Sequence, residues 1–318
     1  MFDNLSIYVI IIWVDWGEKG GLSMMKKRVI VVVLFLAIVA YLLWSNLTFG
    51  ISRYTVESDK LPEVFDGYKI VQVSDLHNAK FGKNNKKLIS AIKKQKPDAI
   101  VMTGDFIDGS KPNIKAPEKF AKEVAKIAPC YYISGNHEAV LDSVVFEKFT
   151  SVIEEYGVVC LDNASMKISK GNDSIQIVGL SDIDFWGKDV DDYVLENTKS
   201  SFVESDYEVM KAAGDYNPDL FTVVLEHRPT FLDYFASENV DLVLSGHAHG
   251  GQVRIPFVGG VVAPDQGFFP KYDAGKYKKD KTEMIVSRGL GNSIIPVRVN
   301  DRPELVVVEL KCKNTEKE

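Results

Sequence analysis

The sequence predicts a single α/β domain in which two mixed β-sheets pack face to face between flanking helices, with an apolar anchor helix ahead of it. Short β-branched segments alternate with amphipathic segments through the first half of the chain, which is typical of a largely parallel sheet with both faces covered. From Gly251 onward the sequence is rich in glycine, proline and short apolar segments, which favours a second sheet. No long linker or repeat interrupts residues 68–310, so we expect one domain.

The expected elements follow in order from hydrophobic periodicity. β-Branched and aromatic segments predict strands in the first half at Tyr68–Val73, Asp98–Met102 and Tyr131–Ile133. Apolar residues at helical spacing predict helices at Asn84–Lys96, Ala116–Ile127 and Phe146–Glu155. In the second half, the same criteria predict a polar helix at Val190–Ala213 and strands at Ser174–Val178, Thr222–Leu225, Leu242–Leu244, Val253–Ile255, Met284–Val286, Ile294–Val299 and Leu305–Leu310.

An unbroken apolar segment near the N-terminus, Val29–Trp44, follows directly on the basic residues Lys26–Arg28. We interpret residues 29–47 as an uncleaved membrane anchor. A cleaved signal peptide is the first alternative, and bulky residues after Ala40 disfavour it. A buried core helix is the second, and the lack of a polar face disfavours it. Because Lys and Arg accumulate on cytoplasmic flanks, we expect a single-pass protein of the cell membrane with the α/β domain outside the cytoplasm.

The remaining domain boundaries follow from this assignment. Residues 1–28 form a leader and basic N-terminus, and we expect translation to begin at Met24 or Met25 because codons for Glu18–Gly21 can contain a ribosome-binding sequence. Residues 48–67 are expected to form a linker with an edge strand, residues 68–312 the α/β domain, and residues 313–318 a polar tail.

Charge and cysteine content disfavour three classes of protein: nucleic-acid-binding proteins, disulfide-rich proteins and zinc ribbons. The net charge is −6 and no basic stripe is present, so nucleic acid is not expected as a main partner. The three cysteines are odd in number and widely spaced, which indicates free thiols rather than a disulfide framework or a zinc ribbon. The sequence leaves the oligomeric state open.

Five apolar segments each end in a polar motif, and together these motifs contain all five histidines of the chain. The motifs are Asp75-Leu76-His77, Gly104-Asp105, Gly135-Asn136-His137-Glu138, Glu226-His227 and Gly246-His247-Ala248-His249. Ligands of α/β sheets bind at the carboxyl ends of strands, so we expect the five motifs at one rim. Imidazole, carboxylate and amide groups without thiolate suit divalent metals. There are more of them than one tetrahedral site needs, which predicts two ions.

This series of motifs, with Asp108 three residues after Asp105, resembles that of the calcineurin-like metallophosphoesterases over residues 68–310. Gly250–Gln252 and Ser287–Gly291 are similar to a bacterial membrane-associated branch, which includes enzymes that act on lipid-linked or cell-envelope phosphates. The resemblance implies a first metal on Asp75, His77 and His249, a second on Asn136, His227 and His247, and Asp105 as the bridge between them. It also implies that His137 faces the substrate as proton donor or phosphate contact, with Glu138 orienting it and Asp108 in a structural role.

The expected activity is therefore hydrolysis of a phosphate ester by a metal-bridging hydroxide, with two divalent ions of Mn, Fe or Zn. A diester or pyrophosphate of an envelope or lipid-linked substrate is the expected target. Arg288 and Arg298 are expected either to contact the substrate phosphate or to form surface ion pairs. The alternatives are a phosphomonoesterase of soluble nucleotides and a non-catalytic metal-binding or scaffold protein on the same fold.

Overall fold

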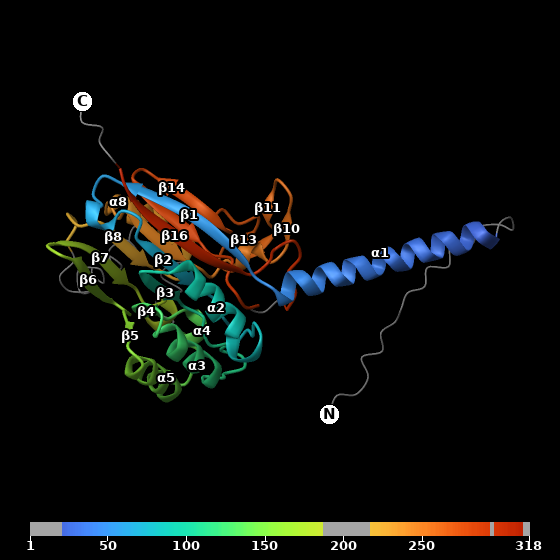
Figure 1. The fold of residues 1–318 in the computed structure, drawn as a ribbon, viewed down its shortest axis with the longest axis horizontal. Coiled ribbons are helices and arrows are strands. Elements are labelled where there is room, and N and C mark those ends of the chain that lie inside the picture. The colour runs from blue at the N-terminus through green and yellow to red at the C-terminus, as the bar shows by residue number, and fades with distance from the viewer. Residues whose placement is uncertain (1–20, 187–216, 293–295, 314–318) are drawn as a thin grey trace. The chain divides into compact units, whose positions relative to one another are not determined.

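Two six-stranded β-sheets organise the domain in the computed structural model (Figure 1), which describes residues 21–186, 217–292 and 296–313. The first sheet consists, in spatial order, of β1 (Gly50–Ser58), β16 (Glu304–Cys312), β2 (Lys69–Val73), β3 (Ala99–Thr103), β4 (Cys130–Ile133) and β5 (Val158–Cys160). Strands β2 to β5 are mutually parallel, β16 is antiparallel to β2, and β1 is parallel to β16. The parallel core of this sheet confirms the prediction from strand and helix alternation.

The second sheet is also mixed. It consists, in spatial order, of β14 (Gly275–Lys279), β15 (Thr282–Val286), β9 (Leu242–Ser245), β8 (Thr222–Leu225), β7 (Asp173–Gly179) and β6 (Ala164–Lys170). The four inner strands are parallel, and β14 and β6 are antiparallel edges. Two short hairpins follow β9 in the chain: β10 (Arg254–Ile255) pairs with β11 (Gly259–Gly260), and β12 (Val262–Ala263) with β13 (Gly267–Phe268).

The strands place alternate side chains in different cores. Val101 of β3 packs between the sheets with Ile177 and Leu244 of the second sheet. Its neighbours Ile100 and Met102 point the other way, into a core beneath the helices of the first sheet. A third core lies between the second sheet and the short helix α8 (Leu232–Ser237). The order of layers is thus helix, sheet, sheet, helix, as the sequence predicts.

The helices on the first sheet are α2 (Lys86–Gln95), α3 (Lys115–Val124) and α5 (Ser143–Glu155), with the single-turn α4 (Asn136–Ala139) beside the strand ends. α5 is typical: Phe149 and Ile153 lie one turn apart and are buried, while the Asp142 carboxylate accepts the Val144 N–H at 3.0 Å and caps the first turn. α2 begins later than predicted because Asn84 and Asn85 take left-handed conformations.

One other prediction is changed by the structure. The strand predicted at Ile294–Val299 is wrong for its described residues, where Val299 makes only an isolated bridge to Val253. The backbone N–H and carbonyl of Arg298 bond instead to the Asn46 side chain, at 2.8 and 2.9 Å. The predicted edge strand is present as β1, and it pairs with β16 along nine residues. The helix predicted at Val190–Ala213 lies outside the described residues.

The apolar N-terminal segment forms a helix, α1 (Gly21–Leu47). Its residues Met24–Leu47 are long and apolar enough to cross a membrane, with a mean hydropathy of 2.5. The boundary between two compact units of the chain falls between Leu43 and Trp44. The last turn of α1 therefore belongs with the domain, and Ser45 within it is buried.

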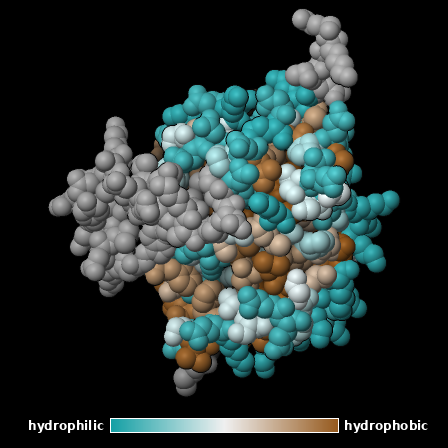
Figure 2. Space-filling model, turned by 90° about the vertical axis from the view of Figure 1, so that its left-hand side faces the viewer, coloured by the Kyte–Doolittle hydropathy of each residue, from teal (hydrophilic) through white to brown (hydrophobic). Residues whose placement is uncertain are grey.

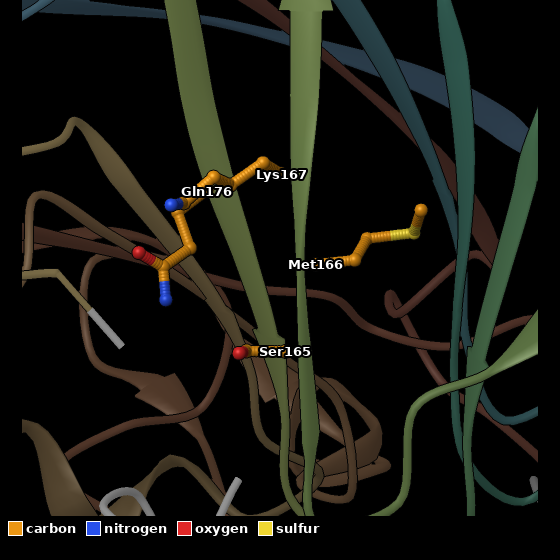
Figure 3. Close-up of a pocket in the computed structure, with 4 residues that line it drawn as sticks. All are labelled: Ser165, Met166, Lys167 and Gln176. Atoms are coloured by element: carbon orange, nitrogen blue, oxygen red, sulfur yellow. The ribbon is translucent and has the colours of Figure 1, made fainter. Parts of the chain in front are cut away.

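The face of the molecule in Figure 2 presents hydrophobic surface as separate patches bordered by hydrophilic residues. A pocket at the edge of the second sheet is lined by Ser165, Met166 and Lys167 of β6 and by Gln176 of β7 (Figure 3). The Gln176 Oε1 accepts the Asn217 N–H at 3.0 Å, which gives this side chain a structural role. The pocket lining contains no imidazole or carboxylate, so it lacks the groups expected of a metal site.

The core beneath α5 generates a stability prediction. Replacing the fully buried Phe149 by Ala should lower the free energy of unfolding by about 3–5 kcal/mol, because the core cannot collapse onto the vacated volume. Replacing Val144, which is 69% exposed on the same helix, by Ala should change it by less than about 0.5 kcal/mol. Urea unfolding of the detergent-solubilised chain, followed by circular dichroism, measures both. Equal effects of the two substitutions would contradict the assigned face of α5.

Candidate metal centre

The carboxyl ends of five inner strands carry the predicted site residues. Asp75 follows β2, Asp105 follows β3, and Asn136 begins α4 just after β4. In the second sheet, His227 follows β8 and His247 follows β9. Because these strands are parallel within each sheet and the sheets face one another, the five ends meet at one rim.

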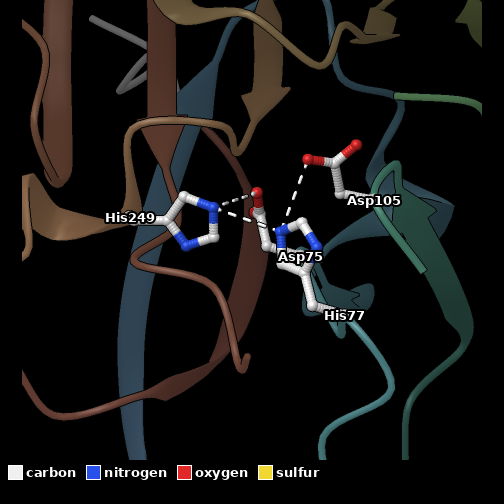
Figure 4. A group of neighbouring side chains, drawn as sticks. All are labelled: Asp75, His77, Asp105 and His249. Atoms are coloured by element: carbon white, nitrogen blue, oxygen red, sulfur yellow. Dashed lines mark hydrogen bonds and ion pairs between the residues drawn. The ribbon is translucent and has the colours of Figure 1, made fainter. Parts of the chain in front are cut away.

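Four buried side chains form a first cluster: Asp75, His77, Asp105 and His249 (Figure 4). The Nε2 atoms of His77 and His249 lie 3.2 Å apart. His77 Nε2 is 3.4 Å from Asp105 Oδ2, and His249 Nε2 is 3.5 Å from Asp75 Oδ1. One potential ligand atom from each residue lies within 4.8 Å of the others. Such convergence of lone pairs away from water suits a cation at their centre.

Asp105 also belongs to a second cluster, with His227 and His247. His227 Nε2 lies 3.3 Å from Asp105 Oδ2 and 3.2 Å from Asn136 Oδ1. The structure therefore brings together all seven residues predicted as ligands, and the Asp105 carboxylate is common to both clusters. Carboxylate, imidazole and amide oxygen are the donors that divalent metals such as Mn, Fe and Zn accept.

Hydrogen bonds around two of the imidazoles assign their tautomers. His227 Nδ1 is 2.8 Å from the Thr103 carbonyl oxygen, so Nδ1 carries a proton and Nε2 is the nitrogen that faces Asp105 and would coordinate a metal. His247 Nε2 is 2.7 Å from Asp265 Oδ2, which leaves the lone pair of this ring on Nδ1. Both rings are thus held by a partner outside the clusters in the way that is usual for metal-binding histidines.

The backbone at two glycines lies in contact with the side chains of the clusters. A Cβ atom on Gly246 would overlap the Ser74 hydroxyl and the Asp75 carboxylate, and one on Gly135 would overlap Asp105 Oδ1. The glycines that precede three of the motifs are therefore required by the packing of the two clusters.

The backbone at the clusters is strained. Five of the seven predicted ligands have positive φ angles: Asp75 at 50°, His77 at 42°, Asp105 at 55°, His247 at 64° and His249 at 47°. Non-glycine residues seldom adopt this region, and such strain persists only where the surroundings impose it. Here the Asp75 carboxylate accepts the His247 N–H at 3.0 Å, and the Asp105 carboxylate accepts the His137 N–H at 2.9 Å. These bonds join one turn to another.

The Asp105 carboxylate and the His227 imidazole stabilise each other's charged forms. Burial opposes the charged form of each group, yet their mutual attraction prevails: the pKa of Asp105 lies well below its usual value and the pKa of His227 well above it. Burial lowers the pKa of His77 and of His249, so these two imidazoles are neutral and offer lone pairs.

Glu138 makes contacts beyond the one that the resemblance implies. Its carboxylate accepts three backbone N–H groups at 2.8 Å, those of Asp105, Ile107 and Gly135. These bonds hold the turns after β3 and β4 beside one another and fix Asp105, while orientation of the His137 ring by Glu138 stays a prediction. Burial, with the charge of Asp105, raises the pKa of Glu138 to about 8, against the three N–H donors.

His137 lies at the rim, with 16% of its side chain exposed. Its Nδ1 accepts the Gly109 N–H at 3.1 Å and lies 3.8 Å from Asp108. In the neutral ring this bond places the proton on Nε2, the nitrogen that can donate it. The ring packs edge-on to His77 with centroids 4.4 Å apart. These contacts are consistent with a residue beside the clusters.

The interpretation of Arg298 as a surface ion-pair partner is wrong, because this side chain is fully buried, while its contact with the substrate phosphate stays a prediction. It donates to the carbonyl oxygens of Arg288 and Gly291 and to Asp301, and its Nη2 lies 3.2 Å from His249 Nδ1. A guanidinium only donates, so this contact places the lone pair of His249 on Nδ1. If His249 binds a metal through Nε2, its proton must lie on Nδ1. The Arg298 guanidinium must then turn away from Nδ1, toward the carbonyl oxygens of Arg288 and Gly291.

Arg288 remains a prediction as a phosphate contact. A third of its side chain is exposed, and its Nε lies 3.9 Å from the carboxylates of Asp301 and Glu304. This separation is longer than a hydrogen bond.

Sequence reasoning missed a network behind the second cluster. Arg228, next to His227, donates to Asp182 at 2.8 and 2.9 Å and to Asp265 at 2.6 Å. Burial opposes ionisation of Asp265, but His247 and Arg228 lower its pKa to about 2. Glu226, whose role the sequence left undefined, accepts the Arg228 N–H at 3.1 Å. Asp265 belongs to no motif, so only the fold could identify it.

Two sheets with converging strand ends and two carboxylate–imidazole clusters that share one carboxylate define the class of dinuclear metal-dependent phosphoesterases. Residues 68–251 match the model of the calcineurin-like phosphoesterase family. The chain belongs to that family and is a metal-dependent phosphoesterase.

Named relatives agree with this assignment. The chain is 30% identical to the uncharacterized metallophosphoesterase YkuE of Bacillus subtilis, over 91% of this chain and 99% of the relative. It is 29% identical to the phosphodiesterase YaeI of Escherichia coli, over 76% of this chain and 82% of the relative. It is 25% identical to the UDP-2,3-diacylglucosamine pyrophosphatase LpxG of Chlamydia trachomatis, over 78% of this chain and 86% of the relative.

The contacts of Glu138 generate a prediction. In Glu138→Gln an amide NH2 must face a backbone N–H that the carboxylate now accepts, so we expect a loss of about 1–3 kcal/mol in the free energy of unfolding. Metal content should fall as well, because the Asp105 turn loosens. Urea unfolding and elemental analysis measure these effects. The exposed Glu147 of α5 provides the matched control, and Glu147→Gln should leave both quantities unchanged. A Glu138→Gln protein with the stability and metal content of its parent would refute this role.

Proposed function

We propose that the chain hydrolyses a phosphate diester or pyrophosphate with two divalent metal ions held at its strand-end rim. The observation that carries the proposal is the position of the Asp105 carboxylate, common to both clusters of potential ligands. A single-metal or purely structural site has no need of a shared carboxylate. Two ions a short distance apart are the arrangement used by phosphatases and nucleases.

The assignment of ligands follows the two clusters. Asp75, His77 and His249 would hold one ion, Asn136, His227 and His247 the other, and Asp105 both. The donor set supports this assignment because it is buried, rich in lone pairs and free of thiolate. When bound, the ions would lower the pKa of a water molecule and attract the oxygens of the phosphate group.

His137 is the side chain that we assign to proton transfer. With its Nδ1 occupied by the Gly109 N–H, the neutral ring carries its proton on Nε2 and can deliver it to the leaving oxygen. Glu138 supports the reaction indirectly, since it holds the turn that carries Asp105. The buried Arg298 restrains His249, which this assignment places on the first metal.

Two relatives support the proposed class of substrate. One is named a phosphodiesterase, and the other a pyrophosphatase of a diacylated glucosamine nucleotide. A lipid-linked or envelope phosphate is consistent with a chain that carries a candidate membrane span. Hydrolysis of chromogenic monoester, diester and pyrophosphate substrates with Mn²⁺ would separate this proposal from a phosphomonoesterase of soluble nucleotides.

The different roles of Asp105 and His137 can be separated experimentally. Asp105→Asn should remove both activity and bound metal, because one charge is lost from two ligand sets. His137→Ala should lower kcat by about 10²–10⁴-fold, the usual effect of a positioned acid, while both metals stay bound. Steady-state kinetics and elemental analysis measure the outcome. Metal loss in His137→Ala, or full metal content in Asp105→Asn, would contradict the assigned roles.

We further propose that α1 anchors the chain in the cell membrane with the domain outside the cytoplasm. The basic residues Lys26–Arg28 precede the span, and such clusters remain on the cytoplasmic side. Protease added to intact spheroplasts should therefore digest residues 68–312. If the domain survives until the membrane is lysed, the orientation is reversed, and the substrate is then a phosphate on the cytoplasmic face.

A further inference from the structure

We propose that the tips of two hairpins beside the metal centre insert into the surface of the lipid bilayer. The first tip is Phe257 with Val258, between β10 and β11, and the second is Phe268 with Phe269, at β13. This surface, which we call the hairpin tips, would hold the catalytic rim at the level of lipid head groups. The inference rests on the proposed membrane anchoring and deepens the proposed substrate class.

The hairpin tips expose large apolar side chains without a packing reason. Phe257 is fully exposed, and the exposed fractions of Phe268, Val258 and Phe269 are 77%, 62% and 61%. Phe257 and Phe269 also have left-handed backbones, with φ angles of 67° and 54°. Glycine or asparagine suits such turn positions better than a bulky aromatic residue. An aromatic side chain that stabilises neither its turn nor a core indicates an external apolar partner.

The position of the anchor identifies that partner as the bilayer. The candidate span ends at Leu47, and the last turn of α1 is bound to the domain without an intervening linker. Asn46 bonds to both backbone groups of Arg298, and the Trp44 ring lies 4.6 Å from the Arg302 guanidinium. The membrane surface must therefore lie close to this part of the domain.

The same part of the domain holds the base of the first hairpin. Val299, next to Arg298, accepts the Arg254 N–H at 3.0 Å. From Arg254 to Phe257 is three residues, a reach of about 10 Å in an extended chain. Figure 1 shows β10, β11 and β13 grouped at the end of the domain where β1 begins. The hairpin tips are thus within a few residues of the point at which the span meets the domain.

The hairpins are equally close to the metal centre. The Val261 N–H donates to the Gly251 carbonyl at 3.2 Å, directly after the His247–His249 motif. Asp265, in the turn between β12 and β13, contacts His247 at 2.7 Å, only three residues before Phe268. A bilayer against the hairpin tips would therefore bring a phosphate in the head-group layer near both clusters. Aromatic side chains favour this interfacial depth.

Tryptophan quenching tests the contact directly and needs no catalysis. The full chain, in phosphatidylcholine nanodiscs, is compared with Phe257→Trp, which adds one tryptophan to the four present. Lipids brominated in the acyl chains should quench most of the added emission. Val144→Trp, on the exposed face of α5, provides the control and should not be quenched. The proposal is wrong if the emission of Phe257→Trp is unaffected, or is quenched no more than that of Val144→Trp.

A paired assay tests the consequence for substrate access. Phe257→Asn combined with Phe269→Asn removes the apolar tips, and asparagine tolerates both left-handed positions, so the fold is retained. On a soluble nitrophenyl phosphodiester the variant should match its parent. On a lipid with the same head group in nanodiscs it should be about tenfold slower, because α1 still tethers the domain but the rim is no longer held at the head groups, which lowers the effective concentration of lipid at the site. Equal rates on the lipid would overturn the proposal. If even the parent hydrolyses neither ester, the proposed function fails, while the quenching result still decides the contact.

Discussion

The burial of the Asp105 carboxylate is the constraint on which the rest of the centre depends. An ionised carboxylate away from water is stable only with hydrogen bonds and positive charge around it. The His137 N–H and the imidazoles of His77 and His227 meet this need, and each comes from a different strand end. Glu138 then fixes the loop that carries Asp105. These groups can meet only if the two sheets face one another. The metal centre therefore depends on the layered architecture.

The backbone strain at the metal centre also arises because its residues come from two different sheets. Seven potential ligands come from turns that leave strands of two different sheets, and an extended continuation of those strands would carry them past one another. Left-handed turns at Asp75, Asp105 and His247 bring the side chains back toward a common point. Hydrogen bonds between the loops offset the conformational energy of these turns, and glycines allow the backbones to touch. A bound cation would stabilise the same arrangement.

Sequence patterns predicted the parts of the molecule that depend on local regularity. The alternation of strands and helices, the strand ends with their histidines and the apolar helix could all be recognised from periodicity and motif spacing. What could not be predicted depends on partners distant in the chain. Arg298 looked like a surface cation, but its partners include Asn46 and His249, and Asp265 had no motif until the fold set it beside His247. Glu138 was identified, but its bonds to two turns follow from their packing rather than from its place in a motif.

The position of β16 has a consequence for how the enzyme is made. This strand, from the C-terminal end of the domain, lies between β1 and β2, which come from its beginning. While the chain emerges from the ribosome, β1 has no neighbour to pair with and the first sheet has an open edge. The residues that brace His249, from Gly291 to Asp301, arrive equally late. Assembly of the centre is therefore postponed until synthesis is nearly complete, and an interrupted chain lacks both β16 and the residues that hold His249.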